Sequence, residues 1–265
     1  MTDPTDTHSA RTRLRTSLYV GLAVLGASAA AFLARTDAIP QSQAYHAFAD
    51  GRSCVGIPNA LDVFSNLAFL FAGMLGARTT LIRWATEETF VRWIWLTFFL
   101  GLIGVSIGSS YYHWSPDNER LMWDRLPMTI GFTGLFAAVV AERIHLKAAR
   151  VVCPVLLCLG VISVLYWRWS ETAGTGDLRP YILIQALPLV AIPLILWATP
   201  RRFDKDGQYL VAIGWYAVAK ALEIGDIWVF EATGVVSGHT LKHLVAGLAC
   251  YLLVRMYRDR RLLTS

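Results

Sequence analysis

The sequence predicts an all-α membrane protein, built as a bundle of eight transmembrane helices with both chain termini in the cytoplasm. Of the 265 residues, 55% are hydrophobic and only 16% are charged, which is more apolar surface than one water-soluble core can bury. Windows apolar enough to cross about 30 Å of hydrocarbon recur along the chain. Because an open sheet would leave unpaired edges in lipid, helices are the expected element.

The first predicted helix covers residues 16–35 and follows a polar, basic tail at 1–15. We expect this helix to be retained, since a polar segment precedes it and it is long enough to span the membrane. A polar loop at 36–58 leads into a seven-helix core at 59–257, and a basic tail at 258–265 follows. The windows of the core are 59–80, 90–112, 121–142, 147–167, 180–199, 207–224 and 236–257.

The distribution of basic residues gives the expected orientation, because cytoplasmic loops collect Lys and Arg. One set of alternate loops holds sixteen of the 24 basic residues, and the opposite set holds five. The other three, Arg125, Lys220 and Lys242, lie inside predicted helices. The net charge of +5 follows from this asymmetry, so it gives no reason to expect a nucleic-acid partner.

Three histidines fall at similar membrane depth, near the ends of predicted helices. His113 closes the helix at 90–112, whereas His239 and His243 begin the last helix as H-T-L-K-H, one turn apart on one face. Ionisable side chains are rare in membrane spans and mark functional sites there. Three imidazoles that leave a fourth position for water are typical of a catalytic zinc site.

Two further polar residues lie at the same depth. Ser109 precedes His113 by one helical turn, and Asp124 lies about one turn inside the next helix. Asp124 could be the general base for a metal-activated water or an acceptor that orients an imidazole. Ser109 could donate a hydrogen bond to an oxyanion. This set suits hydrolysis of an amide or ester, and its depth indicates a lipid substrate in the bilayer.

Each of these residues also has a structural interpretation. Histidines can form hydrogen bonds between helices, and a serine in a membrane helix commonly bonds a carbonyl of its own helix. Asp124 and Arg125 could form an interfacial ion pair. The zinc-protease motif H-E-x-x-H is absent, since Thr240 stands at the Glu position.

Taken together, the motifs resemble those of the alkaline ceramidases and their wider CREST superfamily of seven-helix membrane hydrolases. The matching pieces are G-S-x-x-x-H, an Asp eleven residues later within D-x-L-P-M, H-x-x-x-H in the last helix, and the pair Ser65-Asn66. The resemblance covers roughly residues 59–257. It implies zinc bound by His113, His239 and His243, with Ser109 and Asp124 as catalytic residues. The implied reaction splits the amide of ceramide into a sphingoid base and a fatty acid.

The chain departs from the animal and fungal enzymes in the stretch before its first core helix. That stretch binds calcium in those enzymes, but here Asp50, Asn59 and Asp62 are its only plausible oxygen ligands. Ca²⁺ takes six to eight oxygen ligands, which argues against a complete calcium site. The S-G-H-T-L-K-H and A-K-A-L-E-I-G-D segments look more like bacterial ceramidase-like relatives. This resemblance implies that the protein lies in a bacterial plasma membrane. It also leaves open that the substrate is a lipid other than ceramide.

Other interpretations remain open from the residues alone. A row of charged residues on one predicted helix consists of Lys220, Glu223 and Asp226, and Lys242 lies between the two histidines of the last helix. The charges of this group could neutralise one another. Alternatively, Glu223 or Asp226 could support a zinc ligand, or the row could bind a lipid headgroup. The whole chain could instead be a non-enzymatic lipid-binding or receptor-like protein with a structural zinc. A bis-histidine haem is disfavoured because two of the histidines share one helix face. The sequence indicates no oligomeric state.

Overall fold

The computed structural model confirms the all-α fold. It describes residues 4–263, with side chains from residue 16 onward. The side chains of the predicted 1–15 tail and residues 264–265 of the C-terminal tail therefore lie outside the described residues. Within residues 4–263, every regular element is a helix. The elements are η1 (Gln43–His46), a 3₁₀ helix, and α1 (Pro4–Arg35), α2 (Ala60–Ser65), α3 (Leu67–Ile82), α4 (Thr89–Trp114), α5 (Asn118–Arg143), α6 (Leu146–Thr172), α7 (Arg179–Ala198), α8 (Gln208–Ile224), α9 (Asp226–Thr233) and α10 (Gly238–Asp259).

Six segments of the described chain are long and apolar enough to cross a membrane, which makes this a membrane protein. They are the apolar part of α1, the combined α2 and α3, and each helix from α4 to α7. The last two predicted spans are present as α8 and α10, but both fall short of that standard. α8 has 17 residues, and α10 carries charged and histidine residues along its 22-residue length. Polar content in α10 is expected if this helix supplies a site.

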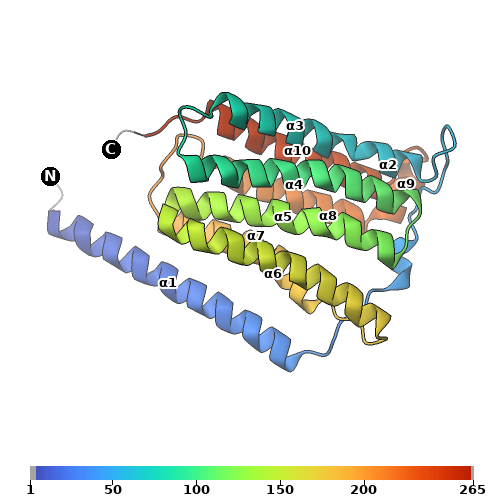
Figure 1. The fold of residues 1–265 in the computed structure, drawn as a ribbon, viewed down its shortest axis with the longest axis horizontal. Helices are drawn as coiled ribbons and strands as arrows, with labels where there is room; N and C mark the ends of the chain where they lie inside the picture. Colours follow the sequence, from blue (N-terminus) through green and yellow to red (C-terminus); the bar gives the residue numbers. More distant parts are fainter. Residues whose placement is uncertain (1–3, 264–265) are drawn as a thin grey trace.

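The helices from α3 to α8 and α10 lie side by side as one elongated bundle, and α1 lies along its outside (Figure 1). α1 packs mainly on α7, where a methyl group added at Gly21 would meet Leu194 at 2.7 Å. The start of α1 and the end of α10 lie at one end of the bundle. We call this the terminal end. η1, α2, α9 and the first turns of α10 form the opposite end, which we call the site end.

The predicted span at 59–80 is broken into α2 and α3 at Asn66. The Asn66 side-chain amide and the Ser65 hydroxyl both donate to the carbonyl oxygen of Asp62, at 2.8 and 2.9 Å. Side chains that bond to nearby carbonyls compete with the helical hydrogen bonds and bend the chain. Hydropathy alone does not detect such a break, because apolar residues continue on both sides.

Close packing of α4 on α5 brings two predicted site residues together. Gly108 is the contact point, since a Cβ atom there would lie 2.0 Å from the carbonyl oxygen of Trp123. Small residues allow membrane helices to approach backbone to backbone. The next residues along the two helices, Ser109 and Asp124, consequently face each other.

Candidate metal centre

The structure brings the three predicted histidines together at the site end. Their rings contact one another pairwise, with centroids 4.8 to 4.9 Å apart. All three are buried, at 1% exposure for His113, 4% for His239 and 3% for His243. Within residues 16–263 they form the one group of side chains suited to hold a metal ion, with ligand atoms within 4.8 Å of one another. We call it the histidine cluster.

A serine fixes which nitrogen His243 offers. The Ser65 hydroxyl donates to the Asp62 carbonyl at 2.9 Å, and Ser65 Oγ lies 2.8 Å from His243 Nδ1. Since a hydroxyl has only one proton, Ser65 must accept from His243 Nδ1–H. The lone pair of His243 is then on Nε2, the nitrogen left to bind a cation.

His239 also presents a lone pair to a cation. The Lys242 ammonium group lies 2.8 Å from His239 Nε2, and an ammonium group can only donate. His239 Nε2 also lies 3.3 Å from His113 Nε2. The remaining ring nitrogen of His113, Nδ1, is buried without a hydrogen-bond partner among the described residues. The Phe48 ring covers His113 and His239, with centroids 4.6 and 4.5 Å away.

These distances fit a tetrahedral metal ion. Two imidazole nitrogens bound at about 2.05 Å to one tetrahedral zinc are about 3.3 Å apart, which equals the observed separation between His113 and His239. The cluster could therefore bind a metal ion. Its contacting rings leave no space for a porphyrin between them, which removes the haem interpretation.

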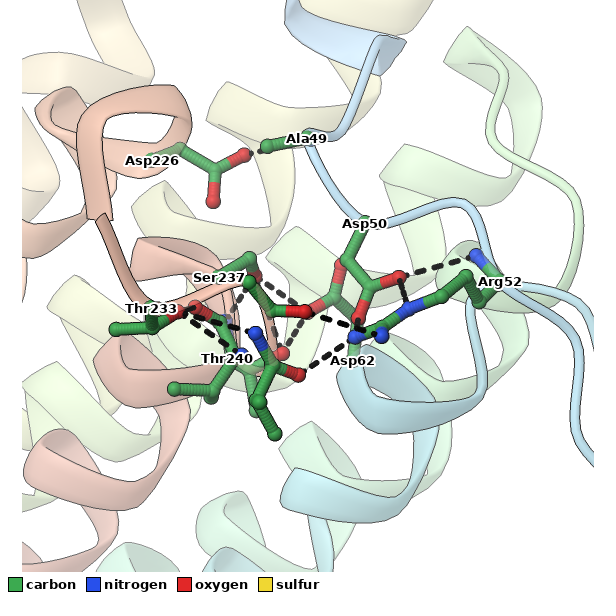
Figure 2. Close-up of polar contacts among 11 residues, drawn as sticks. Ala49, Asp50, Arg52, Asp62, Asp226, Thr233, Ser237 and Thr240 are labelled. Atoms are coloured by element: carbon green, nitrogen blue, oxygen red, sulfur yellow. Dashed lines mark hydrogen bonds and ion pairs between the residues drawn. The ribbon is translucent and has the colours of Figure 1, made fainter. Parts of the chain in front are cut away.

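Several polar contacts fix the helix that carries His239 and His243 (Figure 2). Asp226 accepts hydrogen bonds from the backbone amides of His239 and Ala49, at 2.7 and 2.9 Å. Ser237 caps the first turn of α10 by accepting from the Thr240 amide at 3.0 Å. Thr240 Oγ1 in turn donates to Asp62 at 2.5 Å. The start of α10 is thus tied to α9, α2 and the loop before α2.

A second contact ties this loop to the turn before α10. Arg52 pairs with the buried Asp50 through Nε and Nη2, each at 2.7 Å from a carboxylate oxygen. Arg52 Nη2 also donates to the carbonyl oxygen of Val235 at 2.5 Å. The Arg52 guanidinium holds the pKa of Asp50 below its ordinary value. We call this pair the Asp50–Arg52 clasp.

The remaining predicted site residues also lie beside the cluster. Ser109 forms a hydrogen bond with Asp124, so the carboxylate is turned toward α4. Ser109, Asp124 and His243 all line one cavity of about 210 Å³. The three predicted histidines and the two predicted polar residues therefore occur in one place. A carboxylate beside a possible metal site is positioned to accept a proton from water.

This polar cavity continues into an apolar one. The second cavity has a volume of about 140 Å³ and shares five lining residues with the first. Along α10 the two run from Lys242 to Leu253, about 16 Å at 1.5 Å per residue. The shared residues are Phe69, Val105, Met128, Tyr216 and Ala246. A polar chamber joined to a narrow apolar one fits a molecule with a polar group and a hydrocarbon chain.

The charged row of α8 divides into two parts. Lys220 forms an ion pair with Glu223, and Lys242 lies 3.2 Å from the same carboxylate. Tyr45 also donates to Glu223 at 3.2 Å. Glu223 therefore compensates the charge of these two lysines only in part, so the self-neutralising interpretation of the row holds only in part. Asp226 is separate from them and holds His239 in place through its backbone amide.

The three oxygen-bearing residues proposed for calcium make other contacts. Asp50 is paired with Arg52, and Asp62 accepts from Thr240. The Asn59 amide donates to the carbonyl oxygen of His113 at 2.8 Å, which anchors the end of α4. All three residues therefore support the backbone around the histidine cluster.

Sequence reasoning missed two residues of the site. Phe48 covers the histidine rings, but nothing in the loop sequence distinguishes it from other aromatic residues. Arg125 lines the cavity and forms no ion pair with Asp124 among the described residues, which disfavours the alternative in which the two form an interfacial pair. Its position inside an apolar span was the available signal.

No known protein-family model matches the chain, and a search of curated proteins finds no relative.

Proposed function

We propose that this protein is a zinc-dependent hydrolase of the bacterial plasma membrane that cleaves the amide bond of ceramide-like lipids. The observation that carries the proposal is the cavity where a three-histidine cluster meets a paired serine and aspartate. The resemblance of the motifs to the alkaline ceramidases rests on the same residues and agrees with this interpretation. Both point to an open metal site with a neighbouring proton acceptor.

The donor set favours zinc among the common metals. Three imidazoles with an open fourth position are the ligand set of catalytic zinc sites, whereas structural sites use four protein ligands and favour cysteine. The nearest acidic side chains have other partners, since Asp62 binds Thr240 and Asp124 binds Ser109. Zinc bound here would supply a Lewis acid that activates water and polarises the amide carbonyl.

The residues of the chain would move the proton and stabilise the developing charge. Asp124 accepts the proton of the attacking water and transfers it to the departing amine, which balances the reaction as amide plus water giving carboxylic acid plus amine. Ser109 keeps the Asp124 carboxylate in place and can donate to the oxyanion once Asp124 is protonated. Phe48 excludes water from one side of the cluster.

The apolar cavity supports a lipid substrate. It begins at residues shared with the polar cavity and is lined by side chains such as Phe98, Leu102 and Leu253. A fatty acyl chain placed there would have its amide carbonyl in the polar cavity beside Asp124. The site lies within a membrane-spanning bundle, which suits a substrate that enters from the bilayer.

Metal analysis and product analysis on the same purified samples test the proposal. We expect the wild type to contain stoichiometric zinc and to release a sphingoid base and fatty acid from a ceramide, measured by mass spectrometry. His243→Ala should lose both zinc and turnover. Asp124→Asn should keep zinc and lose turnover by about 10²-fold or more, because it removes a general base.

The control is His145→Ala, which removes a histidine at the terminal end that only caps α6. It should keep both zinc and turnover. Absence of zinc from the wild type would contradict the proposal. Zinc-dependent stability without turnover on any lipid amide would instead favour a non-enzymatic lipid-binding or receptor-like protein.

A further inference from the structure

Arg125 is a buried cation without an anionic partner. It lies on α5 next to Asp124, lines the polar cavity and is 6% exposed. None of the ion pairs formed within residues 16–263 includes it. The neighbouring carboxylate of Asp124 is bonded to Ser109 instead. A charge taken out of water is costly unless another charge or strong hydrogen bonds compensate it.

Aromatic rings and one amide hold the guanidinium group in a fixed position. Its carbon lies 4.2 Å from the ring centre of Trp167, 4.9 Å from that of Tyr181 and 5.9 Å from that of Tyr45. Its Nη2 donates to Gln41 Oε1 at 2.5 Å. The other terminal nitrogen, Nη1, is buried and has no hydrogen-bond partner among the described residues. Arg125 is therefore held in place with one donor group unused.

The charges around the cavity leave an excess of positive charge. The lining includes the cations Arg125, Lys220 and Lys242 and the anions Asp124 and Glu223. Glu223 is shared by the two lysines, so it does not compensate Arg125 directly. A bound anion would balance the lining and would satisfy Nη1.

We propose that Arg125 binds an anionic oxygen on the amine side of the substrate, so that the preferred substrates are N-acylated amphiphiles with a carboxylate or phosphate headgroup. This deepens the proposed hydrolase function and rests on it for the identity of the reaction. Arg125 and Asp124 line the same cavity, which places the anion near the amide to be cleaved. The acyl chain then extends the opposite way, into the apolar cavity.

A binding experiment tests the anion site without depending on hydrolysis. Dodecyl phosphate and dodecanol share one chain, lack an amide and differ in the anionic group. Binding to the purified protein is followed by tryptophan fluorescence, since Trp167 contacts the guanidinium group. We expect the wild type to bind dodecyl phosphate at least about tenfold more tightly, because a hydrogen bond to a charged group is strong. Arg125→Gln should abolish this preference, and Arg125→Lys should keep part of it.

Arg120→Gln is the matched control, because Arg120 lies on the same helix but pairs with Asp117 at the surface. It should bind like the wild type. An equal affinity of the wild type for both amphiphiles, or a preference that survives in Arg125→Gln, would overturn the proposal. If Arg125→Gln is unstable, the preference for dodecyl phosphate over dodecanol can still be compared among the wild type, Arg125→Lys and Arg120→Gln. A preference that is reduced in Arg125→Lys but not in Arg120→Gln supports the anion site, and an unchanged preference in Arg125→Lys contradicts it.

An activity experiment then tests the substrate class. N-lauroylglycine and N-lauroylethanolamine carry the same acyl chain and amide, and only the first is an anion. We expect a higher kcat/KM for N-lauroylglycine, and Arg125→Gln should lower it mainly through KM, by a larger factor than it lowers kcat/KM for the neutral amide. Equal losses on both amides would contradict a headgroup role. If neither amide is cleaved but dodecyl phosphate binds through Arg125, the anion site stands and the hydrolase proposal fails.

Discussion

Buried charges occur at both ends of the bundle, but they are compensated differently. At the terminal end, Arg143 pairs with Asp206, and Arg260 pairs with Glu142, with each of the four side chains at most 3% exposed. Glu142 also accepts from Trp95 and Tyr209, at 3.1 and 2.9 Å. At the site end, three imidazoles face one another and Arg125 has no anionic partner within residues 16–263.

The comparison indicates what separates a structural polar network from a binding site. At the terminal end each buried cation has its own carboxylate, so the buried charges are balanced there, although Asp206 Oδ1 and Arg260 Nε have no hydrogen-bond partner among the described residues. At the site end two groups lack a partner. The histidine cluster lacks a cation, and Arg125 lacks an anion. Buried groups that lack a counterpart raise the free energy of the protein alone and favour the bound state.

The largest effect should come from breaking a compensated pair at the terminal end. Arg260→Met leaves the buried Glu142 carboxylate without its cation, which should destabilise the fold by about 3–5 kcal/mol. Unfolding in detergent, followed by circular dichroism, measures this loss. Zinc content should stay at the wild-type level, because the histidine cluster lies at the other end. A parallel loss of zinc in the folded fraction would contradict the separation of the two ends.

The double variant Arg260→Met with Glu142→Gln is the control for this prediction. It removes the charge that Arg260→Met leaves uncompensated, so it should recover part of the stability. A double variant less stable than the single one would indicate that the packing of Arg260 on Phe203, 4.1 Å from the ring centre, matters more than its charge.

An intermediate effect is expected from Ser65→Ala at the site end. The substitution removes the acceptor that keeps the proton of His243 on Nδ1, so the wrong nitrogen can carry the lone pair. Loss of such a supporting hydrogen bond typically lowers metal affinity by about 10–100-fold. Competition with a chelator of known affinity measures it. Ser110→Ala is the control, since Ser110 on α4 also reaches α2 but its hydroxyl bonds the Val63 carbonyl and no histidine.

The contrast between the ends also explains which features the sequence could predict. Hydropathy located the helices of the seven-helix core within about five residues because a membrane span leaves a long local signal. It missed the start of α1, which begins at Pro4 and not at residue 16. It placed no break at Asn66, where a local side-chain hydrogen bond interrupts an otherwise apolar run. It also gave no sign of α9, which is eight residues long. The convergence of the three histidines was predictable because each lies near the end of a span, at one depth.

The sequence did not predict which side chains far apart along the chain contact each other. Arg260 counts as a basic residue of a cytoplasmic tail, but its side chain is buried against Glu142, 118 residues earlier. Ser65 appeared in a motif without a role, because its bond to His243 spans 178 residues. Spacing and composition do not encode such pairs. They depend on how the helices pack.

We expect a smaller effect on stability from breaking the Asp50–Arg52 clasp, which shares one feature with each end of the bundle. Like the terminal-end pairs it is compensated, but it supports the metal ligands by holding the turn before α10. Asp50 is 2% exposed, whereas the Arg52 side chain is 54% exposed. Solvent screening on the arginine side should make its contribution smaller than that of the buried terminal-end pairs.

The pH dependence of Asp50→Asn tests this clasp. Because Arg52 lowers the pKa of Asp50 in the folded state, the ionised carboxylate stabilises the fold above the unfolded-state pKa of about 3.9. That contribution is lost as the pH falls through the lower, folded-state pKa. Wild type should therefore be more stable than Asp50→Asn at pH 7 and 5, and the difference should shrink below about pH 4. Asp259→Asn, which alters an exposed surface pair with Arg258, should change stability by less than about 0.5 kcal/mol at any pH. A difference for Asp50→Asn that stays constant down to pH 2 would show that the loop is held by its shape and not by the charge of the clasp.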